Sequence, residues 1–213
     1  MWDYLASERW SLLYSGYQHV SFAVQAVLVA TLVALVLAVL VTRVPRLDPV
    51  ANAISAVSLT IPSFALLGLF LPILGLGVGA AFPAVVFYAV MPILRNAVVG
   101  LAGVDKTLLE SARGLGMSRA RILLRVQLPL AWPVILAGIR VSMQMSMGVI
   151  AIAAYVLGPG LGAYIFTGLS QIGGATALYS ALAGTVGVVI LALILDGLLL
   201  LFGRYTTSKG IRV

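Results

Sequence analysis

Five apolar stretches, each about as long as a membrane is thick, dominate this chain of 213 residues. A helix needs about 20 consecutive apolar residues to cross the hydrocarbon of a bilayer. Stretches of that length occupy residues 19–42, 49–74, 81–101, 129–157 and 175–202. None alternates with the period of two that a membrane-spanning strand requires. The sequence therefore predicts an all-α polytopic membrane protein with five transmembrane helices, the second of them kinked at its proline.

The composition provides few charged side chains for a water-exposed surface and few reactive side chains for catalysis. Hydrophobic residues make up 62% of the chain and charged residues 9%, which is too little charge to cover a soluble domain of this size. The chain has no cysteine and one histidine, so thiol chemistry and a histidine metal cluster are excluded. His19 stands at the outer end of the first stretch, where we expect it at the membrane interface.

Basic residues between the apolar stretches predict how the chain is inserted. Ten of the 13 Lys and Arg residues follow the first, third and fifth stretches, whereas the connections 75–80 and 158–174 carry no charge. Cytoplasmic loops are enriched in Lys and Arg. We therefore expect residues 1–18 outside, as an amphipathic lead-in, and residues 203–213 inside, as a cytoplasmic tail. The same rule accounts for the net charge of +7 without nucleic acid as a partner.

The longest polar connection, residues 105–129, has the pattern of two short helices. Leucine and alanine recur at helical spacing up to a break at Gly116, and the pattern then resumes. Asp105 or Thr107 can cap the first helix and Ser118 the second, because their side chains accept hydrogen bonds from free N–H groups. We expect both helices to lie along the cytoplasmic face of the membrane.

The same connection resembles the EAA loop of the permeases of ATP-binding-cassette (ABC) importers. The family pattern is Glu-Ala-Ala, three residues, Gly, nine residues, Ile, one residue and Leu-Pro. This chain has Glu110, Ser111, Ala112, Gly116, Val126, Leu128 and Pro129 at the matching positions. Every spacing matches, and the two departures, Ser111 for alanine and Val126 for isoleucine, are small steric changes.

The resemblance implies a type I permease core over residues 19–202, in a prokaryotic plasma membrane and without enzymatic activity of its own. The helix from Glu110 to Gly116 would dock on a separate ATPase subunit, and Gly116 would permit a sharp turn. Because the chain lacks a phosphate-binding loop, we expect no cofactor in this chain and ATP and Mg on the partner ATPase. The expected partners are two ABC ATPase subunits, a second permease copy or paralogue, an extracytoplasmic substrate-binding protein and membrane lipid.

Two shorter segments, residues 61–65 (IPSFA) and 155–162 (YVLGPGLG), are similar to permeases for quaternary amine osmoprotectants. This resemblance implies glycine betaine, carnitine, choline or proline betaine as the substrate, with the selectivity held by the binding protein. A methionine or other amino-acid importer is the alternative, because such permeases are also compact five-span chains. A non-ABC channel or an intramembrane enzyme is more remote, since Asp196 is the only acidic residue within a stretch.

Candidates for the translocation path are polar, flexible or aromatic residues inside the stretches: Ser63, Phe64, Arg140, Gln144 and Met145. A charge in a membrane span is a functional candidate because it is costly there. Asp196 can pair with Arg140, Arg95 or Arg204, and we favour such a structural pair over proton coupling. For the methionine-rich run 143–147, adaptable helix packing is the alternative to a role on the path.

Overall fold

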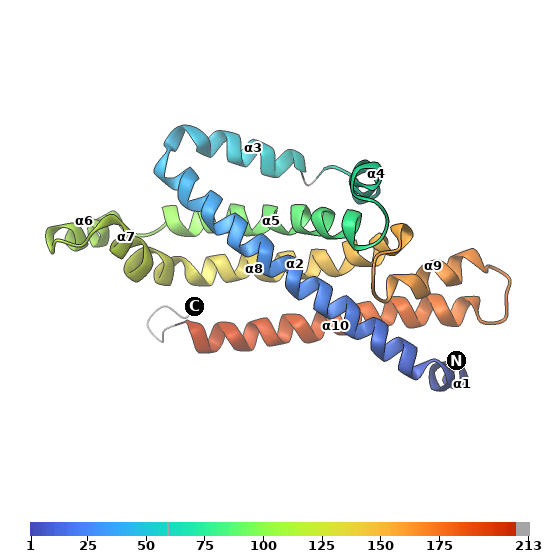
Figure 1. The fold of residues 1–213 in the computed structure, drawn as a ribbon. Coiled ribbons are helices and arrows are strands. Elements are labelled where there is room, and N and C mark those ends of the chain that lie inside the picture. Colours follow the sequence, from blue (N-terminus) through green and yellow to red (C-terminus); the bar gives the residue numbers. More distant parts are fainter. Residues whose placement is uncertain (59, 208–213) are drawn as a thin grey trace.

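The computed structural model describes residues 1–58 and 60–207, and every regular element in this part of the chain is a helix (Figure 1). Four helical segments are long and apolar enough to cross a membrane. They are α2 (Arg9–Arg43), α5 (Val78–Ala102), the continuous segment Arg119–Val156 and α10 (Ala177–Thr206). The all-helical prediction is thus confirmed for the described residues. The predicted tail 203–213 lies outside them from residue 208 onward.

The continuous segment is built from four elements in succession. α7 (Arg119–Ile122) passes into the π-helix η2 (Leu123–Gln127), which is followed by α8 (Leu128–Ala153) and by the 3-10 turn η3 (Ala154–Val156). Pro129 has no N–H to donate to the carbonyl of Arg125, so the α-helical pattern cannot run unbroken through this point. A short π segment is one way in which a helix absorbs such a defect without breaking.

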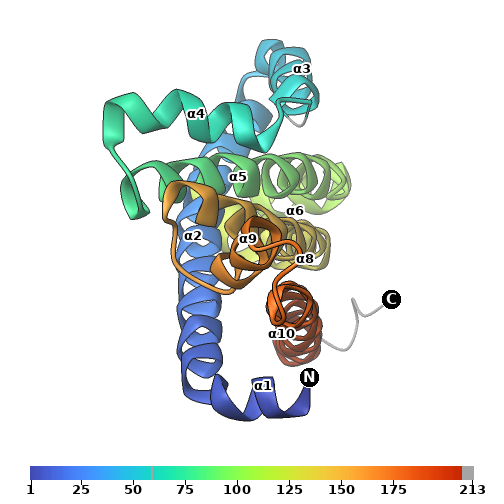
Figure 2. The same cartoon turned by 90° about the vertical axis from the view of Figure 1, so that its right-hand side faces the viewer.

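The second apolar stretch, residues 49–74, forms two helices and not one kinked helix. α3 (Asp48–Ser58) follows the 3-10 turn η1 (Pro45–Leu47), and α4 (Ser63–Leu74) starts after Pro62, whose backbone is extended. Figures 1 and 2 show α4 running crosswise to α3: α4 is seen end-on in the first view and lengthwise in the second. Neither helix reaches the length of a membrane span by itself.

Small residues bring the central helices into close contact. α5 lies between α2 and α8, and on α2 every fourth residue is a fully buried alanine: Ala26, Ala30, Ala34 and Ala38. A Cβ on Gly138 of α8 would lie 2.7 Å from the Cβ of Asn96 and 2.9 Å from the carbonyl oxygen of Pro92, both on α5. Small residues are typical of helix pairs in membranes, because there packing replaces the hydrophobic effect as the driving force.

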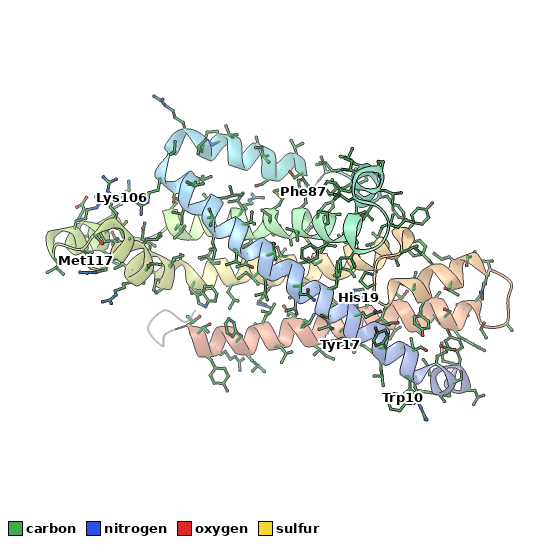
Figure 3. The ribbon with its side chains drawn as sticks, in the orientation of Figure 1. Trp10, Tyr17, His19, Phe87, Lys106 and Met117 are labelled. Carbon is green, nitrogen blue, oxygen red and sulfur yellow. The ribbon has the colours of Figure 1, made fainter. Side chains whose placement is uncertain are left out.

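The two ends of the bundle carry different elements. α6 (Lys106–Gly114) and α7 project from one end, called here the loop end, where Lys106 and Met117 also lie (Figures 1 and 3). α1 (Trp2–Ser7) and α9 (Gly162–Ser170) lie at the opposite end, called here the α9 end. The predicted lead-in is itself helical: after α1, residues from Arg9 onward already belong to α2.

Candidate functional site

The start of α6 is fixed by a side-chain cap. The carboxylate of Asp105 accepts the backbone N–H of Thr107 at 2.8 Å, so Asp105 and not Thr107 caps this helix. That N–H, together with the Thr107 hydroxyl, holds the pKa of Asp105 below its usual value, because both hydrogen bonds favour the charged carboxylate. The α6 helix therefore begins at a defined residue on an otherwise exposed loop.

The end of α6 is a tight reversal at Gly116. This residue has φ +76°, which favours glycine, and its N–H donates to the carbonyl of Arg113. The N–H of Met117 donates to the carbonyl of Ala112 at 3.1 Å, and the two bonds together form a Schellman motif. Ser118 then caps α7 by accepting the N–H of Arg121. The prediction of two short helices joined at glycine is confirmed.

The residues that resemble the EAA pattern differ in exposure. Glu110, Ser111 and Gly116 are exposed, whereas Ala112 is 5% exposed and packs inside the chain. Leu115, which the helical spacing would place with the buried residues, is 84% exposed at the C-cap. Leu115 keeps the helical register, since its N–H donates to the carbonyl of Ser111, but of the apolar residues on this helix only Ala112 is buried by the rest of the chain. The reversal therefore presents an uncovered leucine on the same short helix and turn as the exposed Glu110 and Ser111.

The second half of the pattern lies in the joint between α7 and α8. Val126 is half-buried in the π-helix, and Leu128 and Pro129 open α8. Glu110 to Gly116 thus provide an exposed helix and turn, and Val126 to Pro129 provide the connection from that turn into a long central helix. The first half is therefore exposed to a partner molecule, whereas the second half belongs to the joint that leads into α8.

A cleft of 880 Å³ is lined by α6, by the C-terminal ends of α2 and α5 and by the start of α7. Four cations line it, Arg43, Lys106, Arg113 and Arg119, together with the single carboxylate of Glu110. Within residues 1–58 and 60–207, none of these four cations is ion-paired. The loop end therefore combines an exposed helix with a concave basic surface.

Arg140 and Asp196 form a bidentate ion pair between α8 and α10. The Nε and Nη2 atoms of Arg140 donate to the two carboxylate oxygens of Asp196, both at 2.9 Å. The predicted structural pair is confirmed, with Arg140 as the partner. The pairing neutralises the arginine charge, as expected for an ionisable group inside a membrane span.

Of the remaining path candidates, Gln144 joins this pair: one turn along α8, its exposed side chain hydrogen-bonds the carboxylate of Asp196. Met145 is half-buried. Met143 and Met147 are buried at 5% and 1% exposure, as the packing alternative requires. Ser63 and Phe64 open α4, where the ring of Phe64 contacts Tyr155. Fifteen residues of helix separate Arg140 from Tyr155, about 22 Å along the axis, so the candidates belong to two separate places.

The prediction of an interfacial His19 is wrong. Its side chain is fully buried between α2, α8 and the turn before α9 (Figure 3). The Nδ1 atom accepts the backbone N–H of Leu161 at 3.2 Å, which leaves Nε2 to carry the proton and donate to the carbonyl of Met147 at 3.0 Å. Gly160 lies directly against the ring. Both partners are backbone groups distant in sequence, so no local pattern could reveal them.

Residues 26–207 match the family model described as "Binding-protein-dependent transport system inner membrane component". The chain is 40% identical over 213 residues to the choline transport system permease protein OpuBB of Bacillus subtilis, covering 99% of this chain and 95% of that protein. It is 38% identical over 215 residues to the glycine betaine/carnitine/choline transport system permease protein OpuCB of the same organism, covering 100% and 96%.

Among solved structures, the chain is similar to an inward-facing conformation of the MetNI methionine ABC transporter. The TM-score is 0.80 at 21% identity, and the match covers 95% of this chain and 99% of that one. At this identity the likeness shows a shared fold and carries no information about the substrate.

Proposed function

Because the chain belongs to the family of binding-protein-dependent transport system inner membrane components, we propose that it forms the translocation pathway of an ABC importer for quaternary amine osmoprotectants. The observation that carries this proposal is the 40% and 38% identity, over nearly the whole chain, to permeases named for choline, glycine betaine and carnitine. A methionine importer shares the fold at 21% identity and is the weaker candidate.

The proposed topology has five passes through a prokaryotic plasma membrane, with the N-terminus outside. The passes are α2, α3 together with α4, α5, α8 and α10. The bundle supports this, because α6 and α7 lie at one end while α1 and α9 lie at the other (Figure 1). The basic residues that follow the first, third and fifth stretches would then all be cytoplasmic.

The energy input would come through α6. The exposed side chains of Glu110, Ser111 and Leu115 would dock on an ATPase subunit, with Gly116 setting the direction of the chain beyond them. The partner would bind ATP and Mg and hydrolyse the nucleotide. Two such ATPases, a second permease copy or paralogue and an extracytoplasmic binding protein would complete the assembly, since one subunit of this size cannot enclose a path by itself.

Substrate class and coupling are tested in the complete assembly reconstituted in vesicles. We expect uptake of radiolabelled choline or glycine betaine that requires ATP and the binding protein. Uptake of methionine without either quaternary amine would refute the substrate class.

Coupling is tested with Gly116→Trp, which places a bulky ring at a positive-φ turn on the docking surface. We expect loss of ATPase co-purification and of stimulated hydrolysis. Gly197→Trp is the matched control, because a Cβ at Gly197 on α10 meets open space. Equal coupled hydrolysis in both variants would contradict the docking assignment.

A further inference from the structure

Three aromatic side chains from three separate elements meet toward the α9 end of the bundle. They are Phe64 at the start of α4, Tyr155 in η3 and Phe166 in α9. The ring centroids lie 5.2 Å apart for Phe64 and Tyr155, 5.8 Å for Tyr155 and Phe166 and 6.5 Å for Phe64 and Phe166, at interplanar angles between 53° and 82°. We name these three residues the aromatic triad.

The backbone holds the triad in place from two sides. The carbonyl of Val156, next to Tyr155, accepts the N–H of Gly77 at 2.7 Å. Three residues before Phe64, the carbonyl of Ile61 accepts the hydroxyl of the buried Tyr88 on α5. Both rings are therefore carried on segments tied to α5, and their approach follows from the tertiary fold.

The triad is open on one side. Tyr155 is 65% exposed and Phe64 is 46% exposed, while Phe166 is half-buried behind them. Within the described residues, exposed rings on α2 such as Trp10 and Tyr17 belong to no such cluster (Figure 3). Three rings from distant segments in mutual contact, with two of them uncovered, form instead a surface rich in π electrons.

The two connections near the triad have no charged side chain with which to attract a cation, which leaves the aromatic rings as the attracting groups. The connections at residues 75–80 and 158–174 contain no charged residue. A quaternary ammonium group has no N–H to donate, so the faces of aromatic rings are its characteristic partners in proteins. The rings stand too close together for a trimethylammonium group to enter between them. It would rest on the exposed side of Tyr155 and Phe64.

We propose that the aromatic triad of this permease is a site for the trimethylammonium group of its substrate, outside the binding protein. The inference rests on the proposed function and names residues of this chain for it. Rings that contact the trimethylammonium group on one side only bind it weakly. Weak binding suits a substrate that must leave the site again to continue along the translocation path. Removing one ring should therefore raise the KM for choline about two- to thirty-fold, the range of one cation–π contact.

The test uses the reconstituted assembly in vesicles that lack phosphatidylcholine, with choline as the probe. We compare Tyr155→Leu and Phe64→Leu with the ring-preserving Tyr155→Phe and Phe64→Tyr. Tyr205→Leu is the matched control, because Tyr205 is 86% exposed on α10 near the loop end. We expect a raised KM in the leucine variants of Tyr155 and Phe64 alone, while Tyr205→Leu keeps the wild-type KM and the wild-type basal ATP hydrolysis.

Fluorinating a ring changes its charge distribution with little change of shape, so it separates an effect on ligand recognition from an effect on the folding of the permease. Fluorinated phenylalanines at position 64 weaken the negative ring face without altering packing, and the KM should rise with each added fluorine. A flat fluorine series, or ring-preserving variants as impaired as the leucine variants, would overturn the proposal. So would an effect seen only in vesicles containing phosphatidylcholine, since the ligand would then be a lipid headgroup.

The wild-type assembly separates this inference from the function on which it rests. If it takes up neither choline nor glycine betaine, the proposed function has failed. If it takes up choline and the leucine variants match it, only the triad assignment has failed.

Discussion

The contact between α5 and α8 at Gly138 can be probed by adding a single methyl group. In Gly138→Ala the new Cβ would lie 2.7 Å from the Cβ of Asn96, 2.9 Å from the carbonyl oxygen of Pro92 and 3.1 Å from the Cα of Ile93. Unstrained carbon atoms stay about 3.5–4.0 Å apart. Two of the three neighbours are backbone atoms, which cannot rotate away, so the two helices must separate.

The size of the effect follows from a comparison within one helix. Gly148 also lies inside α8, but a Cβ there meets nothing within 4 Å. Each alanine gains the same helix propensity, up to about 1 kcal/mol relative to glycine. Only Gly138→Ala bears the cost of overpacking, about 1–3 kcal/mol. We expect the free energy of unfolding of Gly138→Ala to lie about 1–3 kcal/mol below that of Gly148→Ala.

Both variants would be purified in the same non-denaturing micelles and unfolded by titration with a denaturing detergent, with helix content followed by circular dichroism. Since propensity cancels between them, the difference between their unfolding free energies reports the contact alone. Equal midpoints and slopes would show that α8 does not approach α5 at Gly138 as closely as the structure has it, and would refute the small-residue contact between these helices.

Three further outcomes are expected. Arg140→Met should lower the free energy of unfolding by about 2.5–3.5 kcal/mol, because it leaves the Asp196 carboxylate without its counterion in a membrane span, and adding Asp196→Leu should restore most of that loss. Additive losses in this double-mutant cycle would show that the two side chains are not coupled. His19→Phe leaves the N–H of Leu161 without its partner, at about 1–3 kcal/mol, and should speed hydrogen exchange at the Leu161 amide. Unchanged exchange would contradict the buried bond. Because the pKa of Asp105 is lowered from 3.8, its cap is complete above that value and is lost as pH falls through the lowered pKa. The protection of the Thr107 amide against exchange, measured relative to an unstructured amide at the same pH, should fall there in the wild type and be low at every pH in Asp105→Ala, while Asp105→Asn keeps the cap without the pH dependence.

Features set by local chemistry were predictable from the sequence. Long apolar stretches predicted most of the spanning helices, because each needs only its own length and hydropathy. The caps at Asp105 and Ser118 and the turn at Gly116 were predictable because their partners lie within a few residues. The Arg140–Asp196 pair was predictable because an unpaired charge in a span is costly and few acidic partners exist.

Features set by distant contacts were not predictable in the same way. The proline in the stretch 49–74 predicted a change of direction, but hydropathy is the same whether a helix runs along the bundle or across it, so the crosswise course of α4 was not predictable. The partners of His19 are backbone groups of Met147 and Leu161, far along the chain. The aromatic triad was found in part: Phe64 and the segment containing Tyr155 were singled out separately, but their meeting and the role of Phe166 required the fold.

The continuous helical segment Arg119–Val156 has a mechanical consequence. It is 38 residues long and connects the turn after α6 with the neighbourhood of Tyr155. Its close contact with α5 at Gly138 lies near its midpoint: about 28 Å of helix extend toward Arg119 and about 27 Å toward Val156. Because the two arms are nearly equal, a tilt of this segment about Gly138 would displace α7 and the surroundings of the aromatic triad by similar distances in opposite directions.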